Sequence, residues 1–420
     1  MKIEKKIAIS IGLFLTFLLV SSRTTVAADK LLYSTDLVYQ GAFRVSPEKF
    51  GGSSLHYGGT AIAYNSNRDS LFIVGHDWYQ QVAEIQIPQL INSSNLNDLK
   101  TAKILQPFTD ITEGHMHNIE AWGAAYSDGV KIGGLMVYGN KLIGSVYAYY
   151  DASGKKSVLS HFTSGLTLST SDFSGMYQVG SKPEVPNPGF VDGYMAAIPS
   201  AWRPLLGGPA LTGNSTIPIT FRTSCGPAAF VFNPDDLGKI DPVPVAAVVY
   251  YSLAHPTLGK WGSTNPNYNG STVIKGVVFP AGSRSVLFFG RHGTGPFCYG
   301  SGTSDPALAG KPASPNGKNK YCYDPSSSDK GTHGYPYVYQ VWAYDANDLV
   351  AVKDGKKNPW DIMPYSVWNF DLPFQPKGRR IGGVAYDPTT QRIFVSQLHS
   401  DGDLPVIHVF KVSPSATGRP

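Results

Sequence analysis

Short apolar runs recur along this chain, and each is bounded by Gly, Pro, Asn or Asp. Runs of this length and spacing are typical of β-strands joined by tight turns. Five segments share one pattern, in which a glycine-led apolar strand is followed by a short turn and a second apolar strand. They start near Tyr57, Ile132, Leu206, Ile274 and Ile381. Each segment is therefore expected to form a β-hairpin.

Further strand patterns follow most of these hairpins. "VAEIQIP", "AAFVFNP", "YVYQVWAYD" and "VIHVFKV" read as third strands, and "VVYYSLA" and "YSVWNFDLP" read as fourth strands. Four strands per unit, repeated five times, predict an all-β fold with a single five-bladed β-propeller. The last unit has only three strands of its own. The unassigned strand "LVYQGAFRV" near the N-terminus is expected to complete that blade and close the ring, which removes open sheet edges.

The first 28 residues have the pattern of a secretory signal peptide. Lys2, Lys5 and Lys6 precede the apolar run from Ile7 to Val20, and the small residues of "TVAA" follow. The run holds 14 apolar or small residues, whereas a membrane-spanning helix needs about 20. We therefore expect a secreted or periplasmic monomer without a membrane span, whose propeller covers residues 29–420.

Composition agrees with a turn-rich β-protein. The 420 residues include 45 Gly and 31 Pro, and only 15% are charged. Without the expected signal peptide the chain has 31 basic and 29 acidic residues, a net charge near +2. Nucleic-acid binding therefore has no electrostatic support.

The three cysteines are Cys225, Cys298 and Cys322. The last two bracket a polar stretch without apolar periodicity, inside an expected insertion at 297–335. In an oxidising compartment these two are predicted to form a disulfide. Cys225 is expected to be a small buried residue.

The stretch "SVLFFGRHGTG" raises a question of function, because its apolar run ends directly on Arg291 and His292. Other units also end their second strand on polar residues, such as His76 with Asp77. In propellers these strand ends share one face with the loops that enter the first strands, and that placement is implied by the resemblance to propellers. The catalytic candidates expected on this face are Asp77, Glu120 and Asp192. The substrate-binding candidates are His76, Trp78, His115, His117, Tyr150, Asp151, Arg222, Trp261, Arg291, His292, Arg380 and His399.

This architecture resembles two groups of five-bladed propellers: glycosidases of the arabinanase and levansucrase type, and lectins of the tachylectin type. The resemblance implies a carbohydrate ligand and favours a glycoside hydrolase that works through carboxylates on one face. The chain departs from the glycosidase pattern because its first strands start with Gly-Gly where carboxylates are expected. Its acids would have to act from loops, and their separation would decide between inverting and retaining chemistry.

Alternatives remain open from the residues. A non-catalytic glycan-binding propeller would need no acid pair. A lyase on uronic acids would use Arg, His and Tyr groups to neutralise the carboxylate and remove a proton. Single histidines of the set could instead join neighbouring blades through hydrogen bonds. The "HMH" of His115 and His117 would point both rings one way if extended, but without a defined third ligand no metal or other cofactor is predicted.

Overall fold

The structure, a computed structural model, describes residues 30–120, 129–149, 157–215 and 222–413. The expected signal peptide and the candidates Tyr150 and Asp151 lie outside these residues. Throughout the described chain, strands outnumber helical segments, so the all-β expectation is confirmed. The same residues contain no helix with the length and apolar character needed to cross a bilayer.

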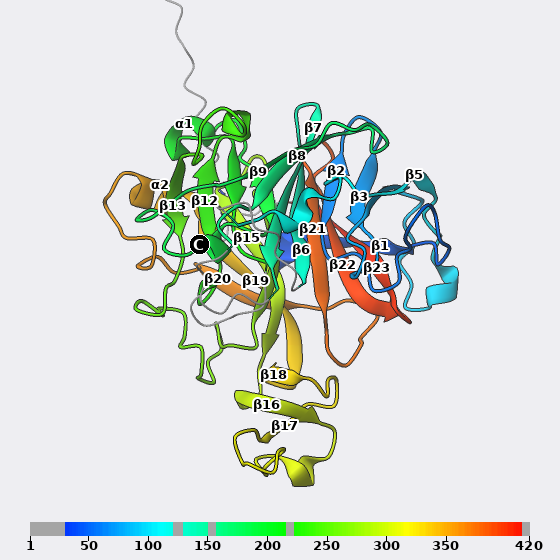
Figure 1. Cartoon of the computed structure of the whole chain (residues 1–420), viewed down its shortest axis with the longest axis vertical. Coiled ribbons are helices and arrows are strands. Elements are labelled where there is room, and N and C mark those ends of the chain that lie inside the picture. The colour runs from blue at the N-terminus through cyan, green and yellow to red at the C-terminus, as the bar shows by residue number, and fades with distance from the viewer. Residues whose placement is uncertain (1–29, 121–128, 150–156, 216–221, 414–420) are drawn as a thin grey trace, which may run out of the picture.

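Five antiparallel sheets of four strands each are present in the described part of the chain (Figure 1). The first contains β2 (Ile62–Asn65), β3 (Ser70–Val74), β4 (Val82–Gln86) and β5 (Ile104–Thr109). The second contains β6 (Val130–Tyr138), β7 (Lys141–Ala148), β8 (His161–Gly165) and β9 (Ser174–Tyr177). The third contains β10 (Met195–Ala197), β11 (Ala210–Thr212), β12 (Ala229–Phe232) and β13 (Val245–Val249).

The fourth sheet contains β14 (Val273–Val278), β15 (Ser285–Gly293), β19 (Tyr337–Asp345) and β20 (Ser366–Phe370). The fifth contains β21 (Ile381–Asp387), β22 (Arg392–Asp401), β23 (Leu404–Val412) and β1 (Leu37–Arg44). Helical turns are short: α1 (Arg203–Leu206), α2 (Ala346–Lys353) and the 3₁₀ turns Ser34–Asp36, Leu96–Asp98, His115–His117, Pro188–Phe190, Pro234–Asp236 and Pro306–Leu308.

The first strands of the sheets pack on one another in a cycle. β2 contacts β6 and β21, β10 contacts β6 and β14, and β14 contacts β21. Glycines allow this close approach, since a Cβ added at Gly134 would lie 2.3 Å from the carbonyl oxygen of Gly193. Central strands such as β3 are buried at every position because neighbouring sheets cover both faces. The five sheets therefore share one interior.

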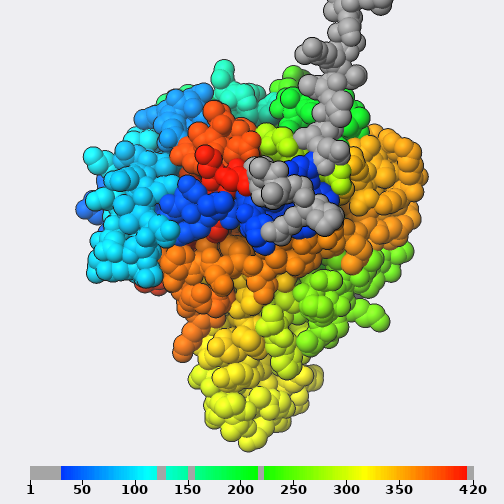
Figure 2. Space-filling view, turned by 180° about the vertical axis from the view of Figure 1, so that it is seen from behind, coloured from blue at the N-terminus to red at the C-terminus, as the bar shows by residue number. Residues whose placement is uncertain are grey.

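The chain's N-terminal strand pairs with its last strand. β1 runs antiparallel to β23, with Leu37 opposite Val412 and Arg44 opposite Val406. The Tyr39 hydroxyl lies 3.0 Å from Nδ1 of the buried His408. Figure 2 shows the two ends of the described chain side by side on this face.

The third unit differs from the sequence expectation. The segment from Leu206 was expected to supply the first strand, but its strand β11 is the second of the sheet, and β10 is the first. β10 spans only three residues, although Gly193 precedes it much as Gly59 precedes β2. An apolar run this short gives little periodicity to detect.

The polar insertion in the fourth unit forms a small sheet of its own from β16 (Cys298–Thr303), β17 (Tyr321–Tyr323) and β18 (Lys330–His333), and it projects from one end of the molecule (Figure 1). The predicted disulfide between Cys298 and Cys322 is confirmed, with the two Cα atoms 5.7 Å apart. Cys225 is a buried free thiol, and burial raises its pKa to about 11. The disulfide ties β16 to β17 on the projecting sheet.

Three buried histidines make the stability of the fold depend on pH. Burial lowers the pKa of His161 and His408 to about 3 and that of His292 to about 4. The rings are therefore neutral when folded and take up protons near pH 6.5 when unfolded. Their contribution is complete above that pH and is lost as the pH falls toward 4.

We expect the melting temperature to fall steadily from pH 7 to pH 4.5, with each histidine contributing at most about 1.4 kcal/mol per pH unit. His408→Gln should make this slope shallower, while His255→Gln, at an exposed ring stacked on Trp360, should not. Calorimetric scans across the pH range would check this. A melting temperature that is flat over the range would contradict it.

Candidate functional site

An ion pair joins the loop after β3 to the first strand of the second sheet. Lys131 Nζ lies 2.7 Å from Oδ2 of Asp77 and also donates to the Asp77 carbonyl oxygen. Gln80 braces the same loop, because its amide donates to that carbonyl and accepts from the Ile132 N–H. The Asp77 side chain stays 41% exposed. This carboxylate is thus held in place and still open to a ligand.

A second acid, Asp192, is enclosed. Its Oδ2 lies 2.6 Å from Nη2 of Arg222, and both side chains are almost fully buried. Burial raises the pKa of Asp192, against the opposing effects of Arg222 and Lys275. Because it is engaged and shielded, Asp192 stabilises the interior and does not face solvent.

Lys275 connects these acids electrostatically. It lies on β14, donates to the Ser215 carbonyl oxygen and sits 5.7 Å from the centre of the Tyr147 ring. Burial lowers its pKa to about 8, although Asp77 and Asp192 oppose that shift. Residues from four sheets therefore meet around one lysine.

A cavity of about 300 Å³ opens beside this lysine, and we call it the cationic cavity. Its basic lining residues are Lys275, Arg291, Lys330 and Arg380. Part of its wall comes from the insertion, which supplies Asp324, Ser326, Ser327, Asp329, Lys330, Gly331, Thr332 and His333. The remaining wall includes Tyr149, whose ring is 47% exposed.

Arg291 both lines this cavity and supports it. Its Nη1 donates to the Gly378 carbonyl oxygen at 2.6 Å, and its guanidinium lies 4.3 Å from the centre of the Tyr337 ring. Burial, with Arg380 nearby, lowers the pKa of Arg291, although it keeps its charge.

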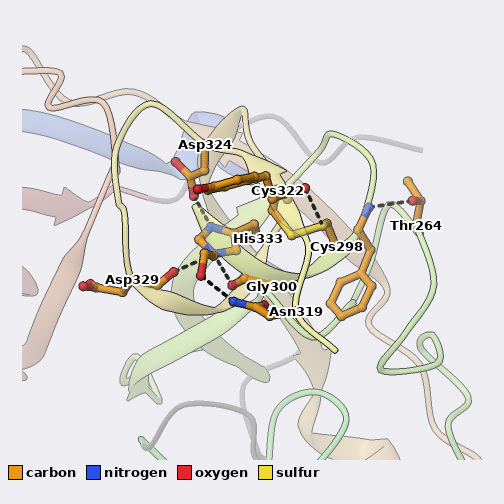
Figure 3. The surroundings of a disulfide bond; sticks show 12 residues. Thr264, Cys298, Gly300, Asn319, Cys322, Asp324, Asp329 and His333 are labelled. Carbon is orange, nitrogen blue, oxygen red and sulfur yellow. Dashed lines mark hydrogen bonds and ion pairs between the residues drawn. A yellow bond between two sulfur atoms is a disulfide. The ribbon is translucent and has the colours of Figure 1, made fainter. Parts of the chain in front are cut away.

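The Tyr337 hydroxyl donates to Asp324, which also pairs with His333 Nδ1 at 2.8 Å. His333 contacts the carbonyl oxygens of Gly300 and Asp329 through its other nitrogen, as Figure 3 shows beside the disulfide. Hydrogen bonds from His333, Ser326 and Tyr337 lower the pKa of Asp324 and outweigh its burial. This network fixes the insertion against the cavity.

An aromatic cluster lies next to the cationic cavity. The Tyr57 ring is 5.8 Å from the His399 ring and 5.4 Å from the His76 ring, and His76 is 5.1 Å from Tyr79. Burial and the charge of Arg380 lower the pKa of His399, while Asp403 and Asp77 act in the opposite sense. We call Tyr57, His76, Tyr79 and His399 the tyrosine–histidine cluster.

A second cavity, the lateral cavity, is lined in part by Tyr79 of this cluster. Its volume is about 680 Å³, and Asp77, Trp78, Tyr79, His117 and Lys131 are among its lining residues. Tyr149 lines both cavities, so they adjoin. Trp78 is 84% exposed and leaves a broad aromatic surface at its edge.

The structure thus places most of the strand-end candidates in one region. The candidates that line a cavity or belong to the cluster are His76, Asp77, Trp78, His117, Arg291, Arg380 and His399. Asp192 and Arg222 lie beneath them as a buried pair.

Other candidates lie elsewhere. His292 points away from Arg291 because neighbouring strand residues face opposite sides, and its buried ring bonds to Thr272. His115 stacks on Phe173, whereas His117 of the same 3₁₀ turn lines the lateral cavity. Glu120 is buried and is not among the described residues that line either cavity, and Trp261 packs on Phe297. Among the described residues, no group of three His, Cys, Asp or Glu side chains could hold a metal ion.

Residues of this region that were not singled out from the sequence include Tyr57, Lys131, Tyr149 and Lys275. The two lysines carried a usable signal, because each is a single charge inside the apolar first strand of a hairpin, in "VKIGGL" and "VIKGVV". A charge in such a strand needs a partner or a water-filled site. The two tyrosines had no comparable signal.

The similarities of this chain to known proteins are structural. No protein-family model matches this sequence, and no curated protein matches it. Similar solved structures include a GH43 endo-arabinanase from Bacillus licheniformis (9% identity, 87% of this chain and 95% of that one, TM-score 0.38). They also include the Bacillus subtilis arabinanase Arb43A (10%, 86% and 96%, TM-score 0.41) and a glycosyl hydrolase from Bacteroides ovatus (10%, 93% and 99%, TM-score 0.41).

Arabinanases, which the sequence pattern resembles, are therefore among the similar solved structures. At identities of 9–10%, the chemistry of this chain has to be argued from its own residues.

The Asp324 network gives a local prediction. Asp324→Asn should weaken the bonds to His333 and Tyr337, at a cost of about 1–3 kcal/mol to the local stability of the insertion. Amide hydrogen exchange of residues 298–333 should become faster while the main melting transition moves little. Asp329→Asn, at an exposed position of the same loop, should leave exchange unchanged. Equal exchange in both variants would show that the network does not hold the insertion.

Proposed function

We propose that the five sheets form a five-bladed propeller closed by the N-terminal strand. The cycle of contacts among the first strands supports this arrangement, as does the pairing of β1 with β23. Closure would remove the exposed edge that β23 otherwise presents. It also keeps the strand-end loops on one face, where the two cavities lie.

Deleting residues 31–45 should expose the β23 edge and remove Tyr39 from His408. We expect the truncated chain to be recovered only as aggregate, whereas a chain lacking only residues 1–28 should fold. Expression followed by calorimetry would compare the two. A truncated protein with an unchanged melting curve would show that closure is not required.

We further propose that the protein is a carbohydrate-active protein whose ligand is an acidic glycan. The observation that carries this proposal is the cationic cavity, where Lys275, Arg291, Lys330 and Arg380 surround one space. Asp324, an acid of its wall, is already engaged by His333 and Tyr337. Guanidinium groups bind carboxylates through two parallel hydrogen bonds, which suits a uronic acid.

Exposed aromatic rings support a sugar ligand. Tyr149 lines both cavities and Trp78 lines the lateral cavity, while Tyr57 of the neighbouring cluster is 45% exposed. Such rings combine an apolar face with a polar rim, as the two faces of a sugar require. The adjoining cavities would hold more than one sugar unit.

The geometry favours acidic-glycan recognition over hydrolysis by the predicted acids. Asp192 is enclosed by Arg222, Asp77 is paired with Lys131, and Glu120 lies away from both cavities. A hydrolase needs two accessible carboxyl groups on either side of the scissile bond. Asp77 is better suited to contact the ligand than to act as one of a hydrolytic pair.

We place the protein outside the cytoplasm. The disulfide is typical of an oxidising compartment, and polymeric acidic glycans occur outside the cytoplasm. The predicted signal peptide would direct this export.

Calorimetric titration with oligogalacturonate and alginate oligosaccharides would test the ligand class. Arg380→Gln should weaken binding about 10- to 100-fold, since a charge-assisted hydrogen bond contributes roughly 1.5–3 kcal/mol. Arg379→Gln removes the same charge one residue away, where Arg379 faces Asp371 and Tyr339. That control should change binding less than about twofold. Equal binding of a neutral glucan, or equal effects of the two variants, would refute the proposal.

A further inference from the structure

Two members of the tyrosine–histidine cluster, Tyr57 and His399, have a strained backbone conformation. Non-glycine residues rarely adopt positive φ, yet Tyr57 and His399 each have φ of 56°, Gln80 has 51° and Arg379 has 41°. Tyr57, Gln80 and Arg379 lie in loops and His399 lies in β22, and the described residues with positive φ also include Asp69, Glu113 and Gln391. Strain of this kind persists only where the surrounding structure holds it, and it is concentrated at functional sites.

The surroundings of Tyr57 and His399 hold them in this conformation. The Tyr57 N–H donates to the Asp403 carbonyl oxygen at 2.8 Å, and the Tyr57 hydroxyl bonds to the Asp403 side chain. His399 lies where the pairing of β22 with β23 is interrupted, between Gln397 and Asp401. A tyrosine hydroxyl and an imidazole are thereby presented together, and the tyrosine remains largely exposed.

We infer that this cluster is the centre of a β-elimination on uronic-acid glycans, with His399 as the base, Tyr57 as the acid and Arg380 on the carboxylate. The inference rests on the proposed acidic-glycan site and names its reaction. It places the reacting sugar against the cluster, between Arg380 of the cationic cavity and Tyr79 of the lateral cavity. The sugar units on one side of the scissile bond would then occupy the cationic cavity, and those on the other side would occupy the lateral cavity.

The reaction needs no co-reactant. His399 removes the proton from C5, beside the carboxylate, and the electron pair forms the C4–C5 double bond. The C4–O bond breaks, and the leaving oxygen takes the Tyr57 proton. One product gains an unsaturated end and the other a hydroxyl group, while proton transfer from the His399 imidazolium to the Tyr57 phenolate, directly or through solvent, restores both groups.

The charges around the two side chains suit these roles. Burial and Arg380 keep His399 neutral and ready to accept a proton, while Asp403 and Asp77 limit that effect. The hydrogen bond to Asp403 raises the pKa of Tyr57 and keeps its proton in place. Environments that move two neighbouring pKa values in opposite directions are characteristic of an acid and base pair. Asp403 is then a positioning residue.

Arg380 supplies the third requirement. Its guanidinium lines the cationic cavity and is near enough to His399 to influence its titration. Pairing the uronate carboxylate with a cation makes the C5 proton more acidic, because the negative charge that develops in the transition state is stabilised. Lys275 and Arg291, on the same cavity wall, would bind the neighbouring uronate.

The experiment uses the full mature chain and a panel of polygalacturonate, alginate and glucuronan, with carrageenan as a sulfated polymer without uronic acid. Binding is measured by calorimetry, and products are followed by ultraviolet absorbance, which detects the C4–C5 double bond. We expect at least one uronan to bind and give unsaturated ends, and carrageenan to give none. Reducing ends without unsaturation, or binding of uronans without any product, would overturn the elimination while leaving the glycan site intact. Failure to bind any uronan would overturn both proposals.

Two variants separate the roles of acid and base. Tyr57→Phe keeps the ring and loses the hydroxyl, and His399→Gln keeps a polar side chain and loses the base. Each should lower the rate of product formation about 10²- to 10⁴-fold while oligosaccharide binding changes less than about threefold. Tyr299→Phe and His255→Gln, at exposed positions outside the cluster, are the matched controls and should keep the wild-type rate.

Exchange of the C5 proton in D₂O, observed by NMR, distinguishes chemistry from a structural role. His399→Gln should abolish exchange, whereas Tyr57→Phe should still catalyse it, since only the leaving group lacks its proton donor. Loss of both activity and binding in these variants, with a lower melting temperature, would show that the cluster is only a structural joint. Retained turnover in either variant would overturn the assigned role.

Discussion

Backbone-to-backbone packing of the first strands is the constraint on which the rest of the structure depends. A Cβ at Gly383 would lie 2.4 Å from the Ile62 nitrogen, and one at Gly276 would lie 2.4 Å from the Val384 Cβ. Only glycine fits where strands from neighbouring sheets approach this closely. The Gly-Gly pattern that leads several units is therefore a packing requirement. Because the strands converge, the loops at their ends converge as well.

This convergence places charged side chains in a partly buried region, where they form ion pairs. Asp192 with Arg222 and Asp77 with Lys131 bridge elements that are distant in sequence. Lys275 is instead held by a backbone acceptor, the Ser215 carbonyl oxygen. A buried cation beside a cavity favours an anionic ligand, because the ligand replaces the hydration that the cation lost on burial. The acidic-glycan proposal follows from this excess of positive charge.

The insertion of the fourth unit forms part of the wall of the cationic cavity. Its disulfide and the Asp324 network give the small sheet a fixed shape, and Arg291 joins it to β15 through Tyr337. Arg291, which ends the apolar run of β15, thus lines the cavity and also supports its wall. In the neighbouring cluster, Tyr57 and His399 lie side by side, each with a positive φ. Rigid support of this kind is what positioned acid–base chemistry requires.

The sequence by itself determined the all-β class, four of the five hairpin positions and the Cys298–Cys322 pair, because period-two patterns, turn residues and cysteine spacing are local signals. It also placed His76, Asp77, Arg291 and His399 at strand ends. Tertiary structure alone decided that His292 turns inward, that Asp192 is enclosed by Arg222, and that the Tyr57 ring meets the His399 ring edge-on. It also decided that β10 precedes β11. These outcomes depend on contacts between residues far apart in the chain, whose distances and burial no local pattern encodes.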